Sequence, residues 1–458
     1  MKRLLLLSLF LFGLTTSLLA EITLKEPKSQ NSRSFAIVVD NTTYNKVENE
    51  ILQYRDAIES VDGLSVFILT VEEENPSVIK NELIKLYEAP AKLEGAVFIG
   101  YIPIPMLRGA QHLTSAYKKN EDKYEWYESS VPSDRFYEDF DLQFKLLRQD
   151  STHSQLYYYW LLPESPQQVR KEIYSGRIKA PVVDDSKYKM IAVYLNKVVE
   201  AKRNPEVLND AFVFTGHGYH SESLNSWNDE IITLREQFPN MFEVGGSLKH
   251  IHFKMNPNMK EILMMEMSRE NLDMAIFHAH GAEETQYLIG YSAAKSIQQN
   301  VTEMKRYFRS KLRYYVHHGR EIQEVKDYYI NQYNVNDTWF EGAFEDSVIT
   351  ADSLFEYNMD IHSKDLALFS PQAEFIMFDE CFNGSFHVEN YISGKYIFGS
   401  GNVISSVANS VNVLQDKWAD KSLGLLRYGV SVGNWHRQVN YLENHIIGDP
   451  TFHFKIKK

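Results

Sequence analysis

Short, unbroken runs of apolar residues recur along this chain, and amphipathic segments separate them. The first three runs occupy residues 35–39, 64–70 and 95–100. Between them, residues 46–61 and the stretch that begins at Pro76 place apolar side chains at helical spacing. Unbroken runs of this length are typical of strands that are buried on both faces of a parallel sheet. The alternation therefore predicts a doubly wound α/β fold.

The same alternation returns in the second half of the chain, which predicts two tandem Rossmann-like subdomains with mostly parallel sheets flanked by helices. Residues 107–170 are rich in Tyr and are expected to be irregular, with residues 157–160 forming a packed edge. A helical insertion is expected outside the sheet at about 291–370. The other expected elements are helices at 186–203, 229–238 and 259–268 and strands at 211–214, 250–253, 274–277, 375–378 and 402–407.

The start of the chain is typical of a secretory signal peptide. Lys2 and Arg3 precede an apolar run at 4–14, and Ala20 is a suitable last residue before cleavage. The run is shorter than the roughly 20 apolar residues that a spanning helix needs. We therefore expect a bacterial protein that is secreted or periplasmic and has no membrane anchor after cleavage. The expected organisation is a signal peptide at 1–20, an extended segment at 21–33, an N-terminal subdomain at 34–180 and a second subdomain at 181–458.

Charge and cysteine content exclude several classes of protein. The chain has 48 Lys and Arg against 61 Asp and Glu, a net charge of −13, and no long basic run. This balance argues against nucleic acid as a partner. Cys381 is the only cysteine. An intramolecular disulfide bond is therefore excluded, and so is a zinc site with several thiolate ligands.

Chemically capable side chains follow three of the expected strands. Ligands gather at the carboxyl ends of the strands in open α/β sheets. Cys381 comes just after the apolar run at 375–378. A cysteine that acts only as a small buried hydrophobe would more naturally lie inside such a run, so the position favours a nucleophile. The three segments are His217-Gly218, 278–285 and 379–386.

A His-Gly pair at a neighbouring strand end supplies what a thiol nucleophile requires. An imidazole can accept the thiol proton and stabilise the thiolate. The N–H group of a glycine can approach a carbonyl oxygen closely, so Gly281 is suited to an oxyanion hole, with the N–H group of Cys381 as a second donor. We therefore expect the Cys381 thiol to be more reactive than an ordinary exposed thiol.

A set of ordered segments extends over residues 35–452. Besides the first apolar run, it comprises 96–100 followed by Ile102-Pro103, 131–137, 174–178, 275–281, 375–386 and 445–452. This set resembles the gingipain-type cysteine peptidases, which belong to the same clan as caspases and legumain. The resemblance implies caspase-like subdomains, with the catalytic one at 181–458. It also implies an endopeptidase that forms an acyl-enzyme through a dyad of Cys381 and His280, with Gly281 at the oxyanion.

The resemblance also implies a protein or peptide substrate and no required cofactor. The family selects basic side chains through an acid in its primary pocket, and Asp229 is the nearest candidate for that acid. Asp229 could instead cap the helix expected there. The family often orients the catalytic imidazole with an acid, but His217 stands at that place here, so the orienting group is unassigned. His280 and Cys381 are 101 residues apart, more than in the relatives, and the helical insertion accounts for this length.

Two other functions stay open. The chain could be a catalytically inactive, gingipain-like binding protein, because a fold does not determine a function. It could also be a metal hydrolase, because a His-x-His motif at a strand end can chelate a metal. The ligands would then be His217, His220, His278 and His280. Asp184 and Asp185 could hold calcium as a structural ion or form a solvated turn.

Overall fold

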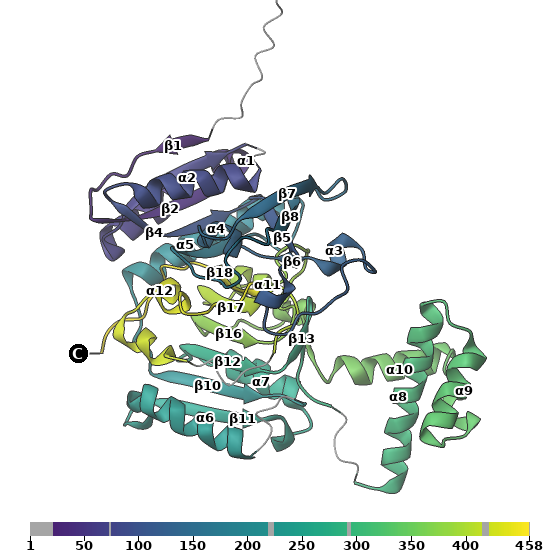
Figure 1. Ribbon diagram of the computed structural model, residues 1–458. Coiled ribbons are helices and arrows are strands. Elements are labelled where there is room, and N and C mark those ends of the chain that lie inside the picture. The colour runs from purple at the N-terminus through teal and green to yellow at the C-terminus, as the bar shows by residue number, and fades with distance from the viewer. Residues whose placement is uncertain (1–21, 73–74, 219–223, 291–294, 415–420, 458) are drawn as a thin grey trace, which may run out of the picture.

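The computed structural model describes residues 22–72, 75–218, 224–290, 295–414 and 421–457. Its core is one sheet of eleven strands in the order β1-β3-β2-β4-β9-β18-β17-β16-β12-β10-β11 (Figure 1). The sheet is mostly parallel, since only the pairs β1–β3 and β17–β18 are antiparallel. Its strands are β1 Thr23–Lys25, β2 Arg33–Asp40, β3 Ser65–Val71, β4 Lys92–Ile99, β9 Tyr174–Ile178, β10 Asp210–Thr215, β11 Ser247–His252, β12 Met274–His278, β16 Phe375–Asp379, β17 Ser405–Asn409 and β18 Asn444–Gly448.

The large, mostly parallel sheet with flanking helices confirms the expected α/β class. It corrects the expectation of two separate sheets, because β18 from the end of the chain pairs with β9 and joins the two halves. The helices are α1 Asn41–Ala57, α2 Pro76–Glu88, α3 Trp126–Ser129, α4 Arg135–Glu138, α5 Ser186–Arg203, α6 Leu224–Gln237, α7 Met259–Met267, α8 Ile297–His317, α9 Ile322–Tyr333, α10 Asp346–Tyr357, α11 Ile392–Phe398 and α12 Val432–His436.

The first helices begin where the sequence supplies capping residues. Asp40 accepts the N–H of Thr43 (2.8 Å) and caps α1. Asn75 caps α2 in the same way, and Pro76 occupies the first turn. The alternating side chains of β2 divide between two cores. One core holds Phe35, Ile37 and Val39 with α1 and α5, and the other holds Ala36 and Val38 with α2.

The Tyr-rich segment is more regular than expected, because it forms a second, four-stranded sheet. In this sheet β8 lies between β5 and β7, so 157–160 is not an edge. Tyr158 and Tyr159 are completely buried, whereas Trp160 is half-exposed. The sequence does not show the alternation typical of a strand here, because aromatic residues fill both faces of β8. The strands are β5 Ile104–Arg108, β6 Val131–Pro132, β7 Phe144–Gln149 and β8 Leu156–Leu161.

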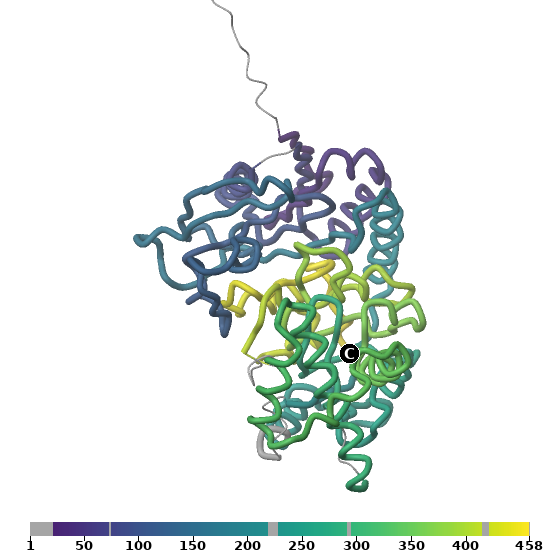
Figure 2. Tube along the Cα trace, turned by 90° about the vertical axis from the view of Figure 1, so that its right-hand side faces the viewer, coloured from purple at the N-terminus to yellow at the C-terminus, as the bar shows by residue number. Residues whose placement is uncertain are grey.

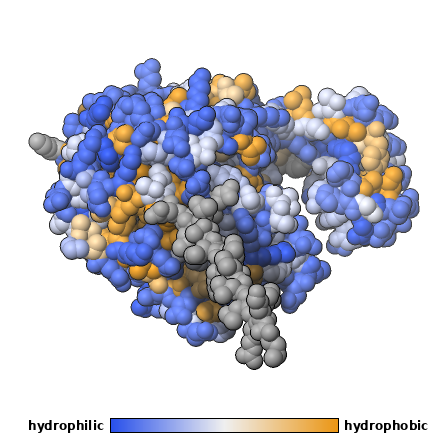
Figure 3. Space-filling model, turned by 90° about the horizontal axis from the view of Figure 1, so that it is seen from above, coloured by the Kyte–Doolittle hydropathy of each residue, from blue (hydrophilic) through white to orange (hydrophobic). Residues whose placement is uncertain are grey.

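The helical insertion projects from one side of the body (Figure 1) and faces the viewer in Figure 2. Its helices α8 and α9 and the segment 335–343 enclose a small core of their own. Several apolar side chains remain exposed on it, among them Ile297 and Leu354. Figure 3 shows apolar residues on the surface of the insertion. A three-stranded sheet lies between the insertion and the large sheet. Its strands are β13 His280–Ala282, β14 Thr285–Tyr287 and β15 Ile361–His362.

Within the described ranges, none of the helices combines the length and the apolar character needed to cross a bilayer. The expected signal peptide at 1–20 lies outside those ranges.

Candidate functional site

Cys381 lies in a tight turn just after β16, near the middle of the second half of the sheet. The next residue, Phe382, has a φ of 59°. This left-handed conformation is rare for an aromatic residue and costs about 1–3 kcal/mol. The N–H groups of Phe382 and Gly384 donate to the carbonyl groups of Val411 and Asn409, at 3.2 and 2.9 Å. The backbone around Cys381 therefore holds a strained turn in place, a feature that clusters at functional sites.

Gly281 packs directly against this turn. A Cβ atom at this position would lie 2.5 Å from the carbonyl oxygen of Cys381, so the close approach requires glycine. Since β13 begins at His280, the turn and the hairpin of β13 and β14 are in contact. The structure therefore brings the His280-Gly281 pair to the turn that carries Cys381.

The side chains of His280 and Cys381 have different neighbours. The exposed imidazole of His280 is directed toward the end of β10, where its Nε2 would lie 3.0 Å from a Cβ atom on Gly218. The Cys381 sulfur instead bonds to the backbone of Val413. It donates to the carbonyl oxygen (3.7 Å) and accepts the N–H (3.4 Å).

The surroundings of the Cys381 thiol raise its pKa above the ordinary value. Burial is the main cause, and the carboxyl groups of Asp379, Glu380 and Glu443 act in the same direction. The hydrogen bond from Val413 opposes them. In this conformation the thiol keeps its proton at neutral pH. The expected high reactivity of Cys381 stays a prediction.

A buried charged cluster lies at the ends of β12 and β16. His278 Nδ1 is 3.0 Å from a carboxylate oxygen of Asp379, and its Nε2 is 2.5 Å from one of Glu230 on α6. Burial alone lowers the pKa of His278, but the two carboxylates outweigh it and raise this pKa to about 10. His278 is therefore an imidazolium at neutral pH. The sequence analysis did not predict Glu230 as a partner of His278. The pairing of His278 with Asp379 could have been expected only because each residue ends a strand.

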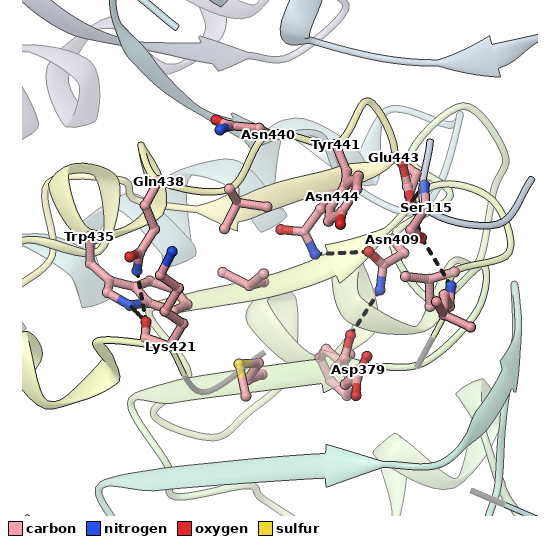
Figure 4. A pocket seen from close by; sticks show the side chains of 16 residues that line it. Ser115, Asp379, Asn409, Lys421, Trp435, Gln438, Asn440, Tyr441, Glu443 and Asn444 are labelled. Atoms are coloured by element: carbon pink, nitrogen blue, oxygen red, sulfur yellow. Dashed lines mark hydrogen bonds between the residues drawn. The ribbon is translucent and has the colours of Figure 1, made fainter. Parts of the chain in front are cut away.

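A cavity of about 440 Å³ lies next to Val413, the residue that holds the Cys381 sulfur (Figure 4). Glu443, which is completely buried, lines it. One carboxylate oxygen of Glu443 accepts the N–H (2.8 Å) and the hydroxyl (2.5 Å) of Ser115. Its other oxygen has no hydrogen-bond partner among the described residues. The apolar part of the wall includes Met377, Val407, Leu414, Trp435 and Val439.

The wall of this cavity is mixed in character. Besides apolar side chains and Glu443, it includes the charged residues Lys421 and Asp379 (Figure 4). Burial raises the pKa of Glu443, while the bonds from Ser115 lower it. No pattern in the sequence pointed to Glu443, because only the pairing of β18 with β17 brings this part of the chain to the site.

The other predicted residues are not part of this cavity. Asp229 is exposed on α6, and it does not cap that helix, which begins at Leu224. Asp184 accepts the N–H of Ser186 (2.8 Å) just before α5. His217 is exposed just after β10, and His220 lies outside the described residues.

No group of three or more His, Cys, Asp or Glu side chains is arranged to hold a metal ion in the parts of the chain that the structure describes. Comparisons with protein-family models, curated proteins and solved structures found no match to this chain. The function must therefore be inferred from the site itself.

Proposed function

We propose that this protein is an exported cysteine endopeptidase with a caspase-like catalytic subdomain. One observation carries the proposal: the only cysteine lies in a strained turn after a central strand, and the glycine of a His-Gly pair packs on that turn. The resemblance of the ordered segments to gingipain-type peptidases supports it. No cofactor is needed for this chemistry.

The reaction begins when the Cys381 thiol gives its proton to His280. The thiolate attacks the scissile carbonyl carbon, and the N–H groups of Gly281 and Cys381 stabilise the oxyanion. His280 then protonates the departing amine, and water releases the acyl group. For the first step, the sulfur must leave Val413, and the exposed imidazole must turn away from Gly218.

The cavity beside Val413 is the proposed pocket for the substrate side chain on the amino side of the scissile bond. Glu443 would pair there with lysine or arginine, in place of Asp229. An apolar substrate side chain would leave the buried carboxylate unpaired, so it should react more slowly.

The activity is tested with a peptide library and three variants of the mature protein. Cys381→Ala should abolish hydrolysis, and His280→Ala should lower kcat by about 10²–10⁴-fold, the usual range for general acid–base catalysis. His217→Ala is the matched control and should retain measurable activity. If the folded wild-type protein cleaves no peptide, the peptidase proposal fails. If only His217→Ala loses all activity, His217 is the base.

The pocket is tested separately with arginine, lysine, aspartate and leucine substrates. Glu443→Gln should reduce the preference for arginine and lysine over leucine by at least about 10-fold, because the charge-assisted bonds are lost. Asp229→Asn, an equally conservative change on exposed α6, should leave the preference unchanged. The opposite pattern would return the role to Asp229.

A gingipain-like binding protein without catalytic activity is the second candidate. The raised pKa of the Cys381 thiol and the position of the His280 imidazole favour it, because a resting dyad would ideally hold the two side chains together. A protein of this kind would bind basic peptides in the same cavity. Calorimetric binding of such peptides without turnover would identify it.

A further inference from the structure

Asn383 is completely buried two residues after Cys381. Its side-chain amide nitrogen donates to the carbonyl oxygens of Ala282 (2.6 Å) and Thr285 (3.1 Å). These two carbonyl groups flank the turn between β13 and β14. A single amide group therefore fastens the hairpin that begins at His280 to the turn that carries Cys381.

Asn383 is itself firmly held. Its backbone carbonyl accepts the hydroxyl (2.7 Å) and the N–H (3.2 Å) of Ser393 at the start of α11. The adjacent Gly384 donates to Asn409 at the end of β17. The hairpin is thus bonded to a fixed point of the large sheet.

The other side-chain atom of Asn383 has a different environment. Its Oδ1 is buried and has no hydrogen-bond partner among the described residues. Burying an unpaired amide oxygen is unfavourable, and an apolar side chain of similar size would avoid this. The hydrogen bonds from its nitrogen to the hairpin therefore best explain why asparagine is present at this position.

We infer that Asn383 is a positioning residue that sets His280 and Gly281 relative to the Cys381 thiol. This inference rests on the proposed peptidase function. A displacement of about 1 Å in a catalytic group can cost about 10²-fold in rate. Gly281 leaves little room for a compensating shift, since a Cβ atom there would also lie 2.8 Å from the Asn383 nitrogen.

The test compares Asn383→Ala with Ser385→Ala. Ser385 lies in the same turn and donates to the carbonyl of Ser410 (2.9 Å), so its loss also removes a buried hydrogen bond but leaves the hairpin untouched. Asn383→Ala should lower kcat by about 10–100-fold with KM changed less than about 3-fold. Ser385→Ala should change both less than about 3-fold. Equal losses of kcat in the two variants would overturn the inference.

Asn383→Asp gives an independent result that does not depend on the alanine variant folding. An ionised carboxylate repels the carbonyls of Ala282 and Thr285, whereas a protonated one can donate a hydrogen bond to one of them. The kcat of this variant relative to wild type should therefore rise as the pH falls. A merely structural role predicts a constant ratio, and this outcome would contradict the inference.

NMR of labelled His280 separates failure of the inference from failure of the peptidase proposal. Alkylation of Cys381 should shift the His280 signal in the wild-type protein and shift it less in Asn383→Ala. If no peptide is cleaved but this difference is seen, the peptidase proposal fails and the positioning role stands. If the shift is the same in both proteins, the positioning role fails whatever the activity.

Discussion

At the scale of single residues, a buried pair of charged side chains connects two of the ordered segments, 131–137 and 174–178. Arg177 places its guanidinium fork on both carboxylate oxygens of Asp134, at 2.7 and 2.8 Å, and both side chains are buried. Each of these residues belongs to a segment that resembles a gingipain connector. A buried ion pair therefore links these two segments inside the protein.

His278 provides a pH-dependent contribution to stability. Its pKa is about 10 in the folded protein and about 6.5 when unfolded, so the folded state binds the extra proton between these values. The stabilisation is fully present below about pH 6.5 and is lost as the pH rises toward 10. His278→Gln should therefore destabilise the protein more at pH 6 than at pH 10.

Urea denaturation of His278→Gln at several pH values measures this effect. His317→Gln, on the exposed end of α8, is the control and should change stability little. A loss that is the same at pH 6 and pH 10 would mean that the cluster contributes only packing.

At the scale of elements, Asp360 is one of the residues that join the insertion to the body of the protein. Asp360, which follows α10, accepts the N–H of Leu288 (2.8 Å). The carbonyl of Leu288 in turn accepts the N–H of His217 (3.0 Å). Gly290 lies so close to His217 that a Cβ atom there would be 2.6 Å from the ring. The segment that follows α10 is therefore connected, through Leu288, to the loop beside His280 that contains His217.

Asp360 should make this anchor sensitive to pH. Burial raises its pKa to about 7, although backbone N–H groups and Lys260 act against the shift. Its stabilisation is present below the unfolded value of about 3.9 and is lost as the pH rises through 7. Asn accepts the same hydrogen bond without titrating. Asp360→Asn should therefore gain stability relative to wild type between pH 4 and 7, and level off above pH 7.

Thermal unfolding of both proteins across this range measures the difference. A constant difference from pH 4 to pH 8 would show that Asp360 does not control the anchor through its charge.

At the scale of the whole molecule, the pairing of β9 with β18 makes one sheet from two halves. A buried charged group reinforces this seam. Asp449, just after β18, accepts the hydroxyl of Tyr54 on α1 (2.6 Å) and lies 3.2 Å from the ammonium of Lys202 on α5. Lys202 also pairs with Asp62 (2.8 Å). The described body should therefore unfold in one cooperative transition.

Asp449→Asn should lower the free energy of unfolding by about 3–5 kcal/mol, because it leaves Lys202 without one of its buried partners. Glu243→Gln breaks an exposed pair with Lys457 and should cost less than about 1 kcal/mol. Calorimetry should show a single transition that shifts to lower temperature in Asp449→Asn. Two separate transitions would show that the halves fold independently.

Local sequence determined the elements and their order. Apolar runs such as Phe35–Val39 and helical spacing at Ser186–Arg203 specify strands and helices through contacts within a few residues, so β2 and α5 could be predicted. The strand-end position of Cys381, and its nearness to Gly281, followed from the rule that parallel strands end at one edge of a sheet. The roles of Cys381 and His280 stay predictions.

Only the tertiary structure decided which side chains meet at that edge. The partners at this edge come from distant parts of the chain. Val413 contacts the Cys381 thiol, and Glu230 contacts His278. Glu443 lines the cavity, and Asn383 is bonded to the hairpin. No spacing in the sequence encodes such pairs, because they depend on strand order and register. The raised pKa of the Cys381 thiol has the same origin. Burial and surrounding carboxylates are properties of the packed molecule, whereas the sequence shows only that a cysteine and a histidine each follow an expected strand.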